Sequence, residues 1–245
     1  MTGIIDAKEY GFLPDGEHFN DGVMAKYIEN DYKTPIFFPE GTYLFSKTIA
    51  FPDLCFVELA AHAEFKLESD EVIDYFITLR RGRTGGGYGF NCYIRGGFIN
   101  ANNKEKNGIG VYKTRHVVFE DFFLKNVLEK GIVARTEEQP DGQSFFRNVL
   151  IENDFALPGT VGVYDNAFDT HFDQVEVVNF ETAYNTICGR FNYCSAWLRD
   201  NSTIGDSTFA VIRGHDIVFT APAVDTYRYG FKIVDPRYNV SITDM

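Results

Sequence analysis

The chain has 245 residues, of which 44% are hydrophobic and 24% are charged, and this composition suits one large globular domain or two small ones rather than a disordered chain. Lys and Arg number 23 against 35 Asp and Glu, so the net charge is −12 and the surface would repel duplex nucleic acid and anionic membranes. No apolar run is long enough to cross a bilayer, and residues 1–10 lack the basic and apolar regions of a signal peptide. Nucleic acid and membrane are therefore not expected partners.

One helix is expected near the start of the chain. Asn20 and Asp21 are good N-cap residues, and Pro35 bounds the segment at its other end. The apolar side chains between them recur at helical spacing: Val23, Met24, Tyr27 and Ile28. No helical pattern of comparable quality follows, and the 24 Phe and 22 Gly instead indicate short β-strands separated by many turns.

The strand-like runs repeat along the chain. In each run, two apolar residues two positions apart place their side chains on one face of a strand. The aligned pairs are Val117/Phe119, Val149/Ile151, Val175/Val177, Ala196/Leu198, Ile217/Phe219 and Val240/Ile242. Their first members are 32, 26, 21, 21 and 23 residues apart, a period typical of a repeat architecture in which each unit buries its apolar face against the next.

One phase of the repeat carries turn-forming residues. Four positions after the first apolar residue, Asn or Asp occurs in five of six units: Asp121, Asn153, Asn179, Asp200, Ala221 and Asp244. Asn and Asp accept left-handed backbone and bond their own turns, so stacked copies predict a turn ladder. A second set of strand-like runs precedes the pairs: Gly108-Ile109, Gly131-Ile132, Gly162-Val163 and Phe231–Ile233.

These patterns together predict an all-β fold, a right-handed parallel β-helix with a short N-terminal capping α-helix. We expect a single domain over residues 1–245. Residues 1–35 would form the entry segment and capping helix, and residues 36–245 the stacked coils.

Three segments resemble the pectate-lyase superfamily of β-helix proteins. Residues 6–12 (Asp-Ala-Lys-Glu-Tyr-Gly-Phe), with Asp15-Gly16 and the helix after them, resemble the entry of these proteins. Residues 39–43 (Pro-Glu-Gly-Thr-Tyr) resemble their first coil, and residues 96–102 (Gly-Gly-Phe-Ile-Asn-Ala-Asn) resemble the next. The resemblance implies the pectin-lyase-like right-handed β-helix over nearly the whole chain.

The resemblance leaves the activity open, because this superfamily includes polysaccharide lyases, glycoside hydrolases, epimerases and bacteriophage tailspike proteins. Polygalacturonase-like hydrolases carry Gly-Asp-Asp and Gly-His-Gly elements, whereas this chain has no Gly-Asp-Asp and reads Gly214-His215-Asp216. No catalytic assignment is therefore carried over. The missing signal peptide favours a protein that is cytoplasmic or associated with a phage particle.

The densest group of acid and base candidates lies in one stretch. It contains Asp165, Asp169, His171 and Asp173, and in an extended chain the last three of these point the same way. Glycoside hydrolysis needs two carboxylates, one as the acid and one as the base or nucleophile. The alternative is an Asp-rich turn whose carboxylates bond local backbone amides.

The repeat phase adds His215 to these catalytic candidates. It predicts that Arg147, Asp173 and His215 share one column of the solenoid, with His171 and Arg213 on the neighbouring column. Asp173 and His215 would then lie about 9 to 10 Å apart, which leaves room for a sugar ring.

Arginines and outward aromatic residues are candidates for binding a sugar. The arginines are Arg147, Arg190 and Arg213. They suit the carboxylates of an acidic sugar or the enolate-like state of a lyase, and the alternative for each is a surface salt bridge. The aromatic candidates are Trp197, Tyr112 and Tyr164. Each is either a platform for the apolar face of a sugar or a packing contact with a loop or another subunit.

No metal or cofactor is expected. The four cysteines match no metal-binding spacing and are interpreted as buried thiols, with a Cys188–Cys194 disulfide left open. A lone Asp-x-His-x-Asp around His171 is a weak metal motif. The number of Asp residues allows Ca²⁺, but no calcium-binding spacing supports it.

Two functions remain as hypotheses. The first, slightly favoured by acidic columns beside outward aromatic residues, is a glycoside hydrolase or polysaccharide lyase that acts on a poly- or oligosaccharide. The alternative is a non-catalytic, trimeric shaft or glycan-binding module of the tailspike kind. The strand at residues 239–244 has no cap after it in the sequence, so we expect either a homotrimer that covers it or a chain that is a fragment.

Overall fold

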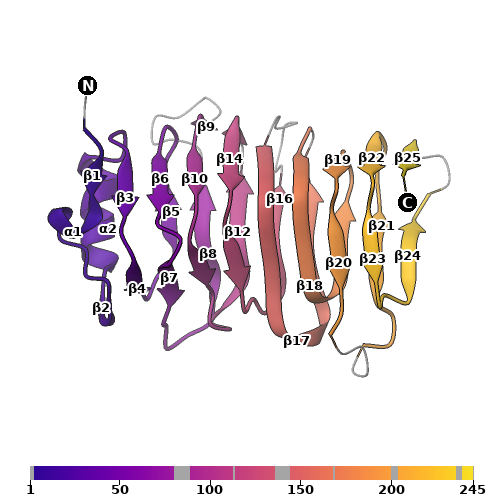
Figure 1. The fold of residues 1–245 in the computed structure, drawn as a ribbon, viewed down its shortest axis with the longest axis horizontal. Helices are drawn as coiled ribbons and strands as arrows, with labels where there is room; N and C mark the ends of the chain where they lie inside the picture. Colours follow the sequence, from indigo (N-terminus) through magenta and orange to yellow (C-terminus); the bar gives the residue numbers. More distant parts are fainter. Residues whose placement is uncertain are drawn as a thin grey trace.

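Three parallel β-sheets run along the length of the molecule, and each successive coil of the chain adds one strand to each sheet (Figure 1). The computed structural model describes residues 3–79, 89–112, 114–135, 144–167, 169–199, 204–235 and 239–244. The predicted right-handed parallel β-helix is confirmed. No helix among the described residues is long and apolar enough to span a membrane.

Every strand of these sheets pairs in parallel with the strand one coil away. Sheet 1 contains β1 (Ile5–Asp6), β3 (Ile36–Phe38), β6 (Phe56–Leu59), β10 (Tyr93–Arg95), β14 (Val117–Glu120), the starts of β17 (Ser144–Asn166) and β18 (His171–Thr186), β19 (Gly189–Asn192), β22 (Ile217–Thr220) and β25 (Val240–Thr243). Sheet 2 contains β2 (Asp15–Phe19), β4 (Gly41–Phe45), β7 (Ala63–Leu67), β11 (Phe98–Asn100), β15 (Phe123–Lys125), the middles of β17 and β18, β20 (Ser195–Trp197) and β23 (Ala223–Asp225). Sheet 3 contains β5 (Ile49–Phe51), β8 (Ile73–Leu79), β12 (Glu105–Tyr112), β16 (Lys130–Arg135), the ends of β17 and β18, β21 (Thr208–Ile212) and β24 (Tyr229–Ile233). A separate small sheet pairs β9 (Gly89–Phe90) with β13 (Thr114–Arg115).

Two helices lie at the N-terminal end of the solenoid, α1 (Ala7–Tyr10) and α2 (Asp21–Asn30) (Figure 1). The sequence pattern predicts α2, and its Met24 and Tyr27 are buried as the helical spacing requires. Asn20 is its N-cap residue, but the amide of Asn20 bonds the backbone of Leu13 instead of capping the helix. The four-residue helix α1 is too short to leave a periodic signal in the sequence.

Stacked rings fill the core beneath sheet 1. Five phenylalanines from five consecutive coils lie one above another: Phe119, Phe146, Phe172, Phe191 and Phe219. Their successive ring centroids are 5.3, 5.1, 4.8 and 4.4 Å apart, and adjacent ring planes differ by no more than 11°. Because parallel strands repeat about every 4.8 Å, identical residues in register stack at the distance that aromatic rings prefer.

The predicted turn ladder is real, but it occupies two different turns. Asn153 and Asn179 follow sheet 2 and are buried; the Asn153 amide bonds both backbone groups of Val127, and the Asn179 amide donates to the Asn153 carbonyl at 2.7 Å. Asp121 and Asp244 instead follow sheet 1, where each adopts a left-handed backbone. The alignment of repeats in the sequence therefore places strands of two different sheets at the same position. It does so because the strands of every sheet show the same alternation of buried residues.

A column of glycines marks the entry of sheet 3. Gly108, Gly131 and Gly162 lie in adjacent strands of consecutive coils, as the register of the following residues shows. A Cβ on Gly131 would lie 2.6 Å from the Gly162 carbonyl oxygen and 2.6 Å from the Ile151 methyl group. A side chain at this position would push the coils apart.

Glu105 is an unusual buried residue at the start of β12. Its side chain is inaccessible to solvent, and neither carboxylate oxygen has a hydrogen-bond partner among the described residues. The Oδ1 of Asn107, two residues along the same strand, also lacks a partner there. Burial raises the pKa of Glu105 to about 9, so the carboxyl is protonated in the folded protein at neutral pH.

We predict that Gly131→Ala lowers the free energy of unfolding by roughly 1–3 kcal/mol, because the added methyl group overpacks the space between two coils. Gly230→Ala in β24 of the same sheet is the matched control, since nothing lies within 4 Å of its Cβ position. Urea denaturation measures both. Equal stability of the two variants would contradict the close-packed glycine column.

We further predict that Glu105→Gln removes a pH dependence of stability. The folded state keeps a proton that the unfolded chain, with an ordinary carboxyl pKa near 4.5, releases, so the free energy of unfolding falls as pH rises from about 4.5 towards 9. The variant should match the wild type near pH 4.5 and exceed it by about 5 kcal/mol at pH 8, because pH 8 lies about 3.5 units above the unfolded pKa and each unit is worth about 1.4 kcal/mol. Thermal melts across this range test it, with the exposed Glu71→Gln as control; parallel wild-type and Glu105→Gln curves would contradict it.

Candidate functional site

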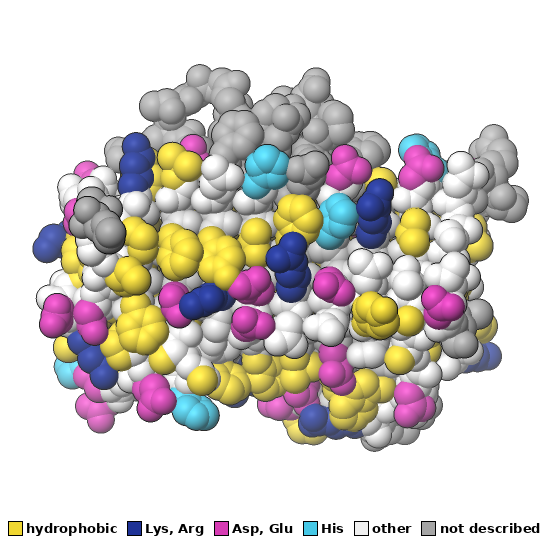
Figure 2. All heavy atoms as spheres, turned by 45° about the horizontal axis from the view of Figure 1, so that its top comes forward, with side chains coloured by type: hydrophobic (Ala, Val, Ile, Leu, Met, Phe, Trp, Pro, Cys, Tyr) yellow, Lys and Arg dark blue, Asp and Glu magenta, His cyan; other side chains and the backbone are white. Residues whose placement is uncertain are grey.

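The outer face of sheet 1 carries two rows of side chains that run along the solenoid axis. We call Phe56, Tyr93, Val118, Phe145 and His171 the ring row, and Glu58, Arg95, Glu120, Arg147 and Asp173 the charge row. Register places the five members of each row on five consecutive coils. Figure 2 shows a band of apolar side chains with a line of acidic and basic side chains beside it.

Rings of the ring row stack in pairs across adjacent coils. The rings of Phe56 and Tyr93 have centroids 4.9 Å apart and planes 24° apart. Those of Phe145 and His171 are 4.9 Å and 25° apart. All four side chains are partly buried, so each ring has one face or edge towards solvent. The row therefore consists of two stacked ring pairs with Val118 between them.

The charge row alternates in sign from one coil to the next. Arg95 pairs with Glu58 at 2.6 Å, and the Tyr93 hydroxyl donates to Glu120. Each arginine also lies over the ring of its own strand: the Arg95 guanidinium is 6.0 Å from the Tyr93 ring and the Arg147 guanidinium 5.2 Å from the Phe145 ring. In register, Arg147 falls between Glu120 and Asp173. Alternation puts opposite charges side by side, which stabilises neighbouring strands.

Local electrostatics keep the ring row uncharged. Burial lowers the pKa of His171, and the nearby Arg190 and Arg147 lower it further against the opposing effect of Asp169. His171 is therefore a neutral imidazole at neutral pH. Burial and the hydrogen bond to Glu120 raise the pKa of Tyr93. The face thus presents neutral rings beside charges that largely offset one another.

Some of the predicted site residues gather on this face. Arg147, His171, Asp173 and Arg190 lie on sheet 1, and His171 and Asp173 point outward together as the sequence predicts. Asp169 precedes them in an exposed turn with a left-handed backbone.

Asp165 lies in the interior instead. Its carboxylate accepts hydrogen bonds from the hydroxyls of Thr186 and Thr170 and from the Ala167 amide, at 3.0 to 3.2 Å, and its exposure is 0%. Burial raises its pKa to about 7, although these hydrogen bonds and the charge of Arg213 act in the opposite direction. This carboxyl holds the turn that leads from sheet 3 to sheet 1.

The predicted column that joins Arg147, Asp173 and His215 is wrong for His215. His215 is exposed in the turn before β22 and bonds Asp216 at 2.7 Å, whereas Asp173 lies at the far end of its own sheet 1 segment. Arg213 likewise is not beside His171, because it follows the end of β21 in sheet 3. Both errors arise because the repeat alignment counts Asp173 back from a sheet 2 strand and His215 back from a sheet 1 strand.

The remaining binding candidates lie on two other faces. Trp197 points outward on sheet 2, where its indole donates to Glu176 and the Arg199 guanidinium lies 5.4 Å from its ring. Sheet 3 carries the others. Arg213 lies 4.9 Å from the Tyr164 ring and bonds Asn185, and Tyr112 packs edge-on against Tyr75. These aromatic residues therefore do not form one site with the sheet 1 face.

Sequence reasoning missed most of the two rows. Phe56, Tyr93 and Phe145 precede buried residues, and Glu58, Arg95 and Glu120 follow them in the same strands. The repeat alignment combines strands of sheet 1 with strands of sheet 2. If the sheet 1 strands alone are aligned on their buried residues, the position after the buried residue reads Glu, Arg, Glu, Arg and Asp on successive coils.

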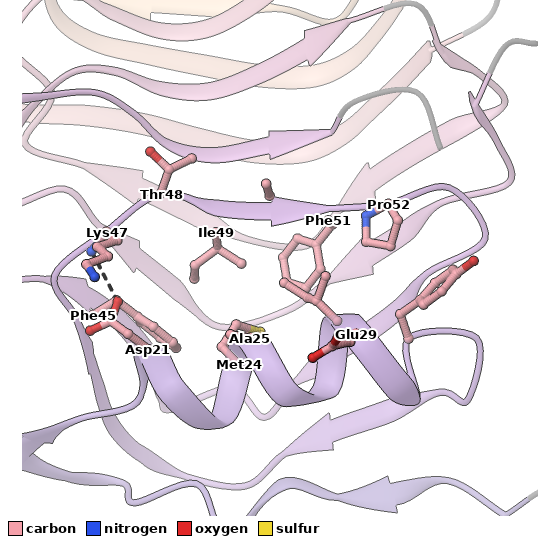
Figure 3. A pocket seen from close by; sticks show the side chains of 13 residues that line it. Asp21, Met24, Ala25, Glu29, Phe45, Lys47, Thr48, Ile49, Phe51 and Pro52 are labelled. Carbon is pink, nitrogen blue, oxygen red and sulfur yellow. Dashed lines mark hydrogen bonds between the residues drawn. The ribbon is translucent and has the colours of Figure 1, made fainter. Parts of the chain in front are cut away.

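Hollows in the part of the chain that the structure describes also lie outside these rows. One, of about 550 Å³, separates α2 from β5 and is lined by Met24, Ile28, Ile49 and Phe51 among others (Figure 3). Another, of about 470 Å³, follows the turn between sheets 1 and 2 over Phe98, Phe123 and Leu150. No group of three or more His, Cys, Asp or Glu side chains suited to a metal ion occurs in the part of the chain that the structure describes.

Comparison with known proteins identifies the fold. No family model and no curated protein matches the chain. Among solved structures, pre-mature bacteriophage phi29 gene product 12 matches with a TM-score of 0.71 and 14% identity over 98% of this chain and 37% of that one. The chain has a parallel β-helix fold. The fold that the resemblance in the sequence implies is thereby confirmed.

Other structures share this β-helix more distantly. Iota-carrageenase complexed to iota-carrageenan fragments has a TM-score of 0.54 and 10% identity over 89% of this chain and 57% of that one. ORF18 of Geobacillus virus E2 has a TM-score of 0.50 and 12% identity over 94% and 62%. The chain thus spans well under half of the phi29 protein and less than two thirds of the other two.

Proposed function

We propose that the chain is a non-catalytic, glycan-binding β-helix of a phage particle, and that it binds sugar along the sheet 1 face. The observation that carries the proposal is the ring row, in which two stacked pairs of partly exposed rings flank Val118 and run beside the charge row over five coils. Two of the similar structures are phage or viral proteins, and a third is complexed to a glycan, which supports both parts of the proposal.

The two rows offer complementary contacts to an oligosaccharide. Aromatic rings pack against the C–H faces of sugars, and the charged side chains donate to and accept from hydroxyl groups. Five coils span about 19 Å between the first and the last strand, enough for several sugar rings in line. Because acids and arginines alternate, the face lacks the excess positive charge that a polyanion requires, and we expect a neutral glycan.

A homotrimer is part of this proposal. The apolar side chains of Phe98, Phe123 and Leu150 face outward on sheet 2 in three consecutive coils, beside the hollow of about 470 Å³. A contact with a second copy would remove this apolar row from water.

A hydrolase is the second candidate, on one specific observation. Glu120 and Asp173 lie two strands apart with Arg147 between them, a separation of about 9 to 10 Å. That is the upper end of the spacing between the acid and base of inverting glycosidases. In this alternative the neutral His171 beside Asp173 assists in proton transfer.

We predict that Tyr93→Ala and Phe145→Ala each weaken glycan binding about tenfold, or about 1.4 kcal/mol, because each removes a ring of the strip. Affinity electrophoresis against dextran, starch and galactan, with polygalacturonate and iota-carrageenan as acidic polymers, identifies the ligand and measures the loss. Tyr229→Ala is the matched control, an exposed aromatic residue on sheet 3.

Retention by no polymer, or equal losses in all three variants, would contradict a sheet 1 binding site. The same mixtures are assayed for reducing ends and for the ultraviolet absorbance of unsaturated uronates, and we expect neither. Release of reducing ends that Asp173→Asn abolishes while binding persists would establish the hydrolase instead.

We also predict that the protein sediments at three times the chain mass and that Phe123→Lys shifts it to the monomer, because the lysine places a charge within the apolar row. Phe155→Lys is the control, since Phe155 is 78% exposed and lies outside that row. A wild-type monomer at micromolar concentration in analytical ultracentrifugation would refute the trimer without affecting the glycan site.

A further inference from the structure

Two of the four cysteines face each other across adjacent coils. Cys55 immediately precedes β6 and Cys92 immediately precedes β10, and Phe56 pairs with Tyr93 in the parallel register. The Tyr93 amide donates to the Cys55 carbonyl at 2.9 Å, which extends the pairing back to the cysteines. Both side chains are buried, with 1% and 2% exposure.

The two thiols are in hydrogen-bonding contact with one another. The Cys92 thiol also lies 3.2 Å from the Pro52 carbonyl oxygen. Leu54, the residue before Cys55, has a left-handed backbone with φ 63°, and this turn directs the amides of Leu54 and Cys55 towards the Cys92 sulfur. Cys92 therefore has the amides of Leu54 and Cys55 and the Cys55 sulfur around it, and its own thiol donates to the Pro52 carbonyl.

These contacts distinguish the reactivity of the two sulfurs. The hydrogen bond from Cys55 and the two backbone amides lower the pKa of Cys92 despite its burial. The hydrogen bond to Cys92, together with burial, raises the pKa of Cys55. Since the thiolate is the reactive form, the two amides beside its sulfur point to Cys92 as the attacking thiol and to Cys55 as the resolving one.

The other two cysteines lack this arrangement. Cys188 precedes β19 in sheet 1 and Cys194 precedes β20 in sheet 2, so they belong to different sheets of one coil. Burial raises the pKa of both thiols. Cys194 directs its sulfur towards the Phe172 carbonyl at 3.6 Å. Cys188 and Cys194 therefore provide an internal control within the same protein.

We propose that Cys55 and Cys92 form an inter-coil dithiol that a peroxide oxidises to a disulfide. The Cys92 thiolate attacks one peroxide oxygen and becomes a sulfenic acid as the O–O bond breaks; the departing hydroxide takes up a proton to leave as water. The Cys55 sulfur then attacks the sulfenic sulfur, its proton leaves with the hydroxyl as a second water, and the S–S bond forms. Two thiols lose two electrons and hydrogen peroxide gains two.

The fold accommodates the product without moving the coils. In-register residues of parallel neighbours have Cα atoms about 4.8 Å apart, within the range that a disulfide spans. The bond would fasten β6 to β10 and close the loop of chain between them, which restricts the unfolded state and stabilises the solenoid. This inference does not depend on the proposed glycan-binding function.

The experiment uses the full chain and hydrogen peroxide. The reduced protein is treated with equimolar peroxide, unfolded in the presence of iodoacetamide, and digested for mass spectrometry without reduction. We expect a linked peptide pair that contains Cys55 and Cys92, two hydrogens lighter than the separate peptides, with Cys188 and Cys194 alkylated. The oxidised protein should melt several degrees above the reduced one, and dithiothreitol should reverse the difference.

Variants identify the order of attack. Cys55→Ser should accumulate a sulfenic acid on Cys92 that dimedone labels, whereas Cys92→Ser should leave Cys55 unlabelled. Cys188→Ser should still form the link. The proposal would be overturned if all four cysteines were alkylated after peroxide treatment, or if Cys188 and Cys194 were linked in place of the expected pair. The peptide map of the wild-type protein decides this even where a variant fails to fold.

Discussion

In-register stacking at about 4.8 Å is the constraint on which the whole molecule depends. A paired strand residue of an inner coil has a counterpart directly above and below it, so a side chain that stabilises one coil must also suit its two neighbours. Phenylalanine satisfies this rule in the core, where Phe146 and Phe172 stack with planes 9° apart. Asparagine satisfies it in the buried turns, and glycine satisfies it where backbones approach too closely for a methyl group.

The same rule explains the outer face of sheet 1. Like charges one strand apart would repel each other, whereas Arg95 lies between Glu58 and Glu120 and attracts both. Each arginine additionally covers the ring of its own strand, so charge and aromatic rows form together. The strip is therefore preorganised by folding, and a ligand that lies along the axis meets side chains that need little reordering.

Much of the fold could be predicted from the sequence because stacking leaves a periodic record. The buried pair Val175/Val177 and the helical spacing of Met24 and Tyr27 both specify which face is buried. The register was harder to predict. An apolar residue at every second position is the signature of all three sheets, so Val117 of sheet 1 and Val149 of sheet 2 look alike in one dimension. Only the three-dimensional pairing separates them.

The site was less predictable for a related reason. Asp165 and Asp173 are indistinguishable as acidic residues of one stretch, yet Asp165 turns inward to the hydroxyls of Thr170 and Thr186 while Asp173 points outward. Strand alternation sets direction within a strand, but the turn between the two segments resets it. Asp165, which sequence proximity groups with the other acids, is the carboxylate that the fold uses for its own turn.

Geometry also bears on the choice between binding and catalysis. Catalysis needs groups that converge on one reacting bond, whereas a straight ladder distributes them along a line at a fixed interval. On sheet 1, Arg147 lies between Glu120 and Asp173 and offsets both charges, and Glu120 already accepts the Tyr93 hydroxyl. A carboxylate held by such neighbours is a good hydrogen-bond acceptor for sugar hydroxyls. The straight spacing of these groups is therefore consistent with the recognition that we propose rather than with convergence on one bond.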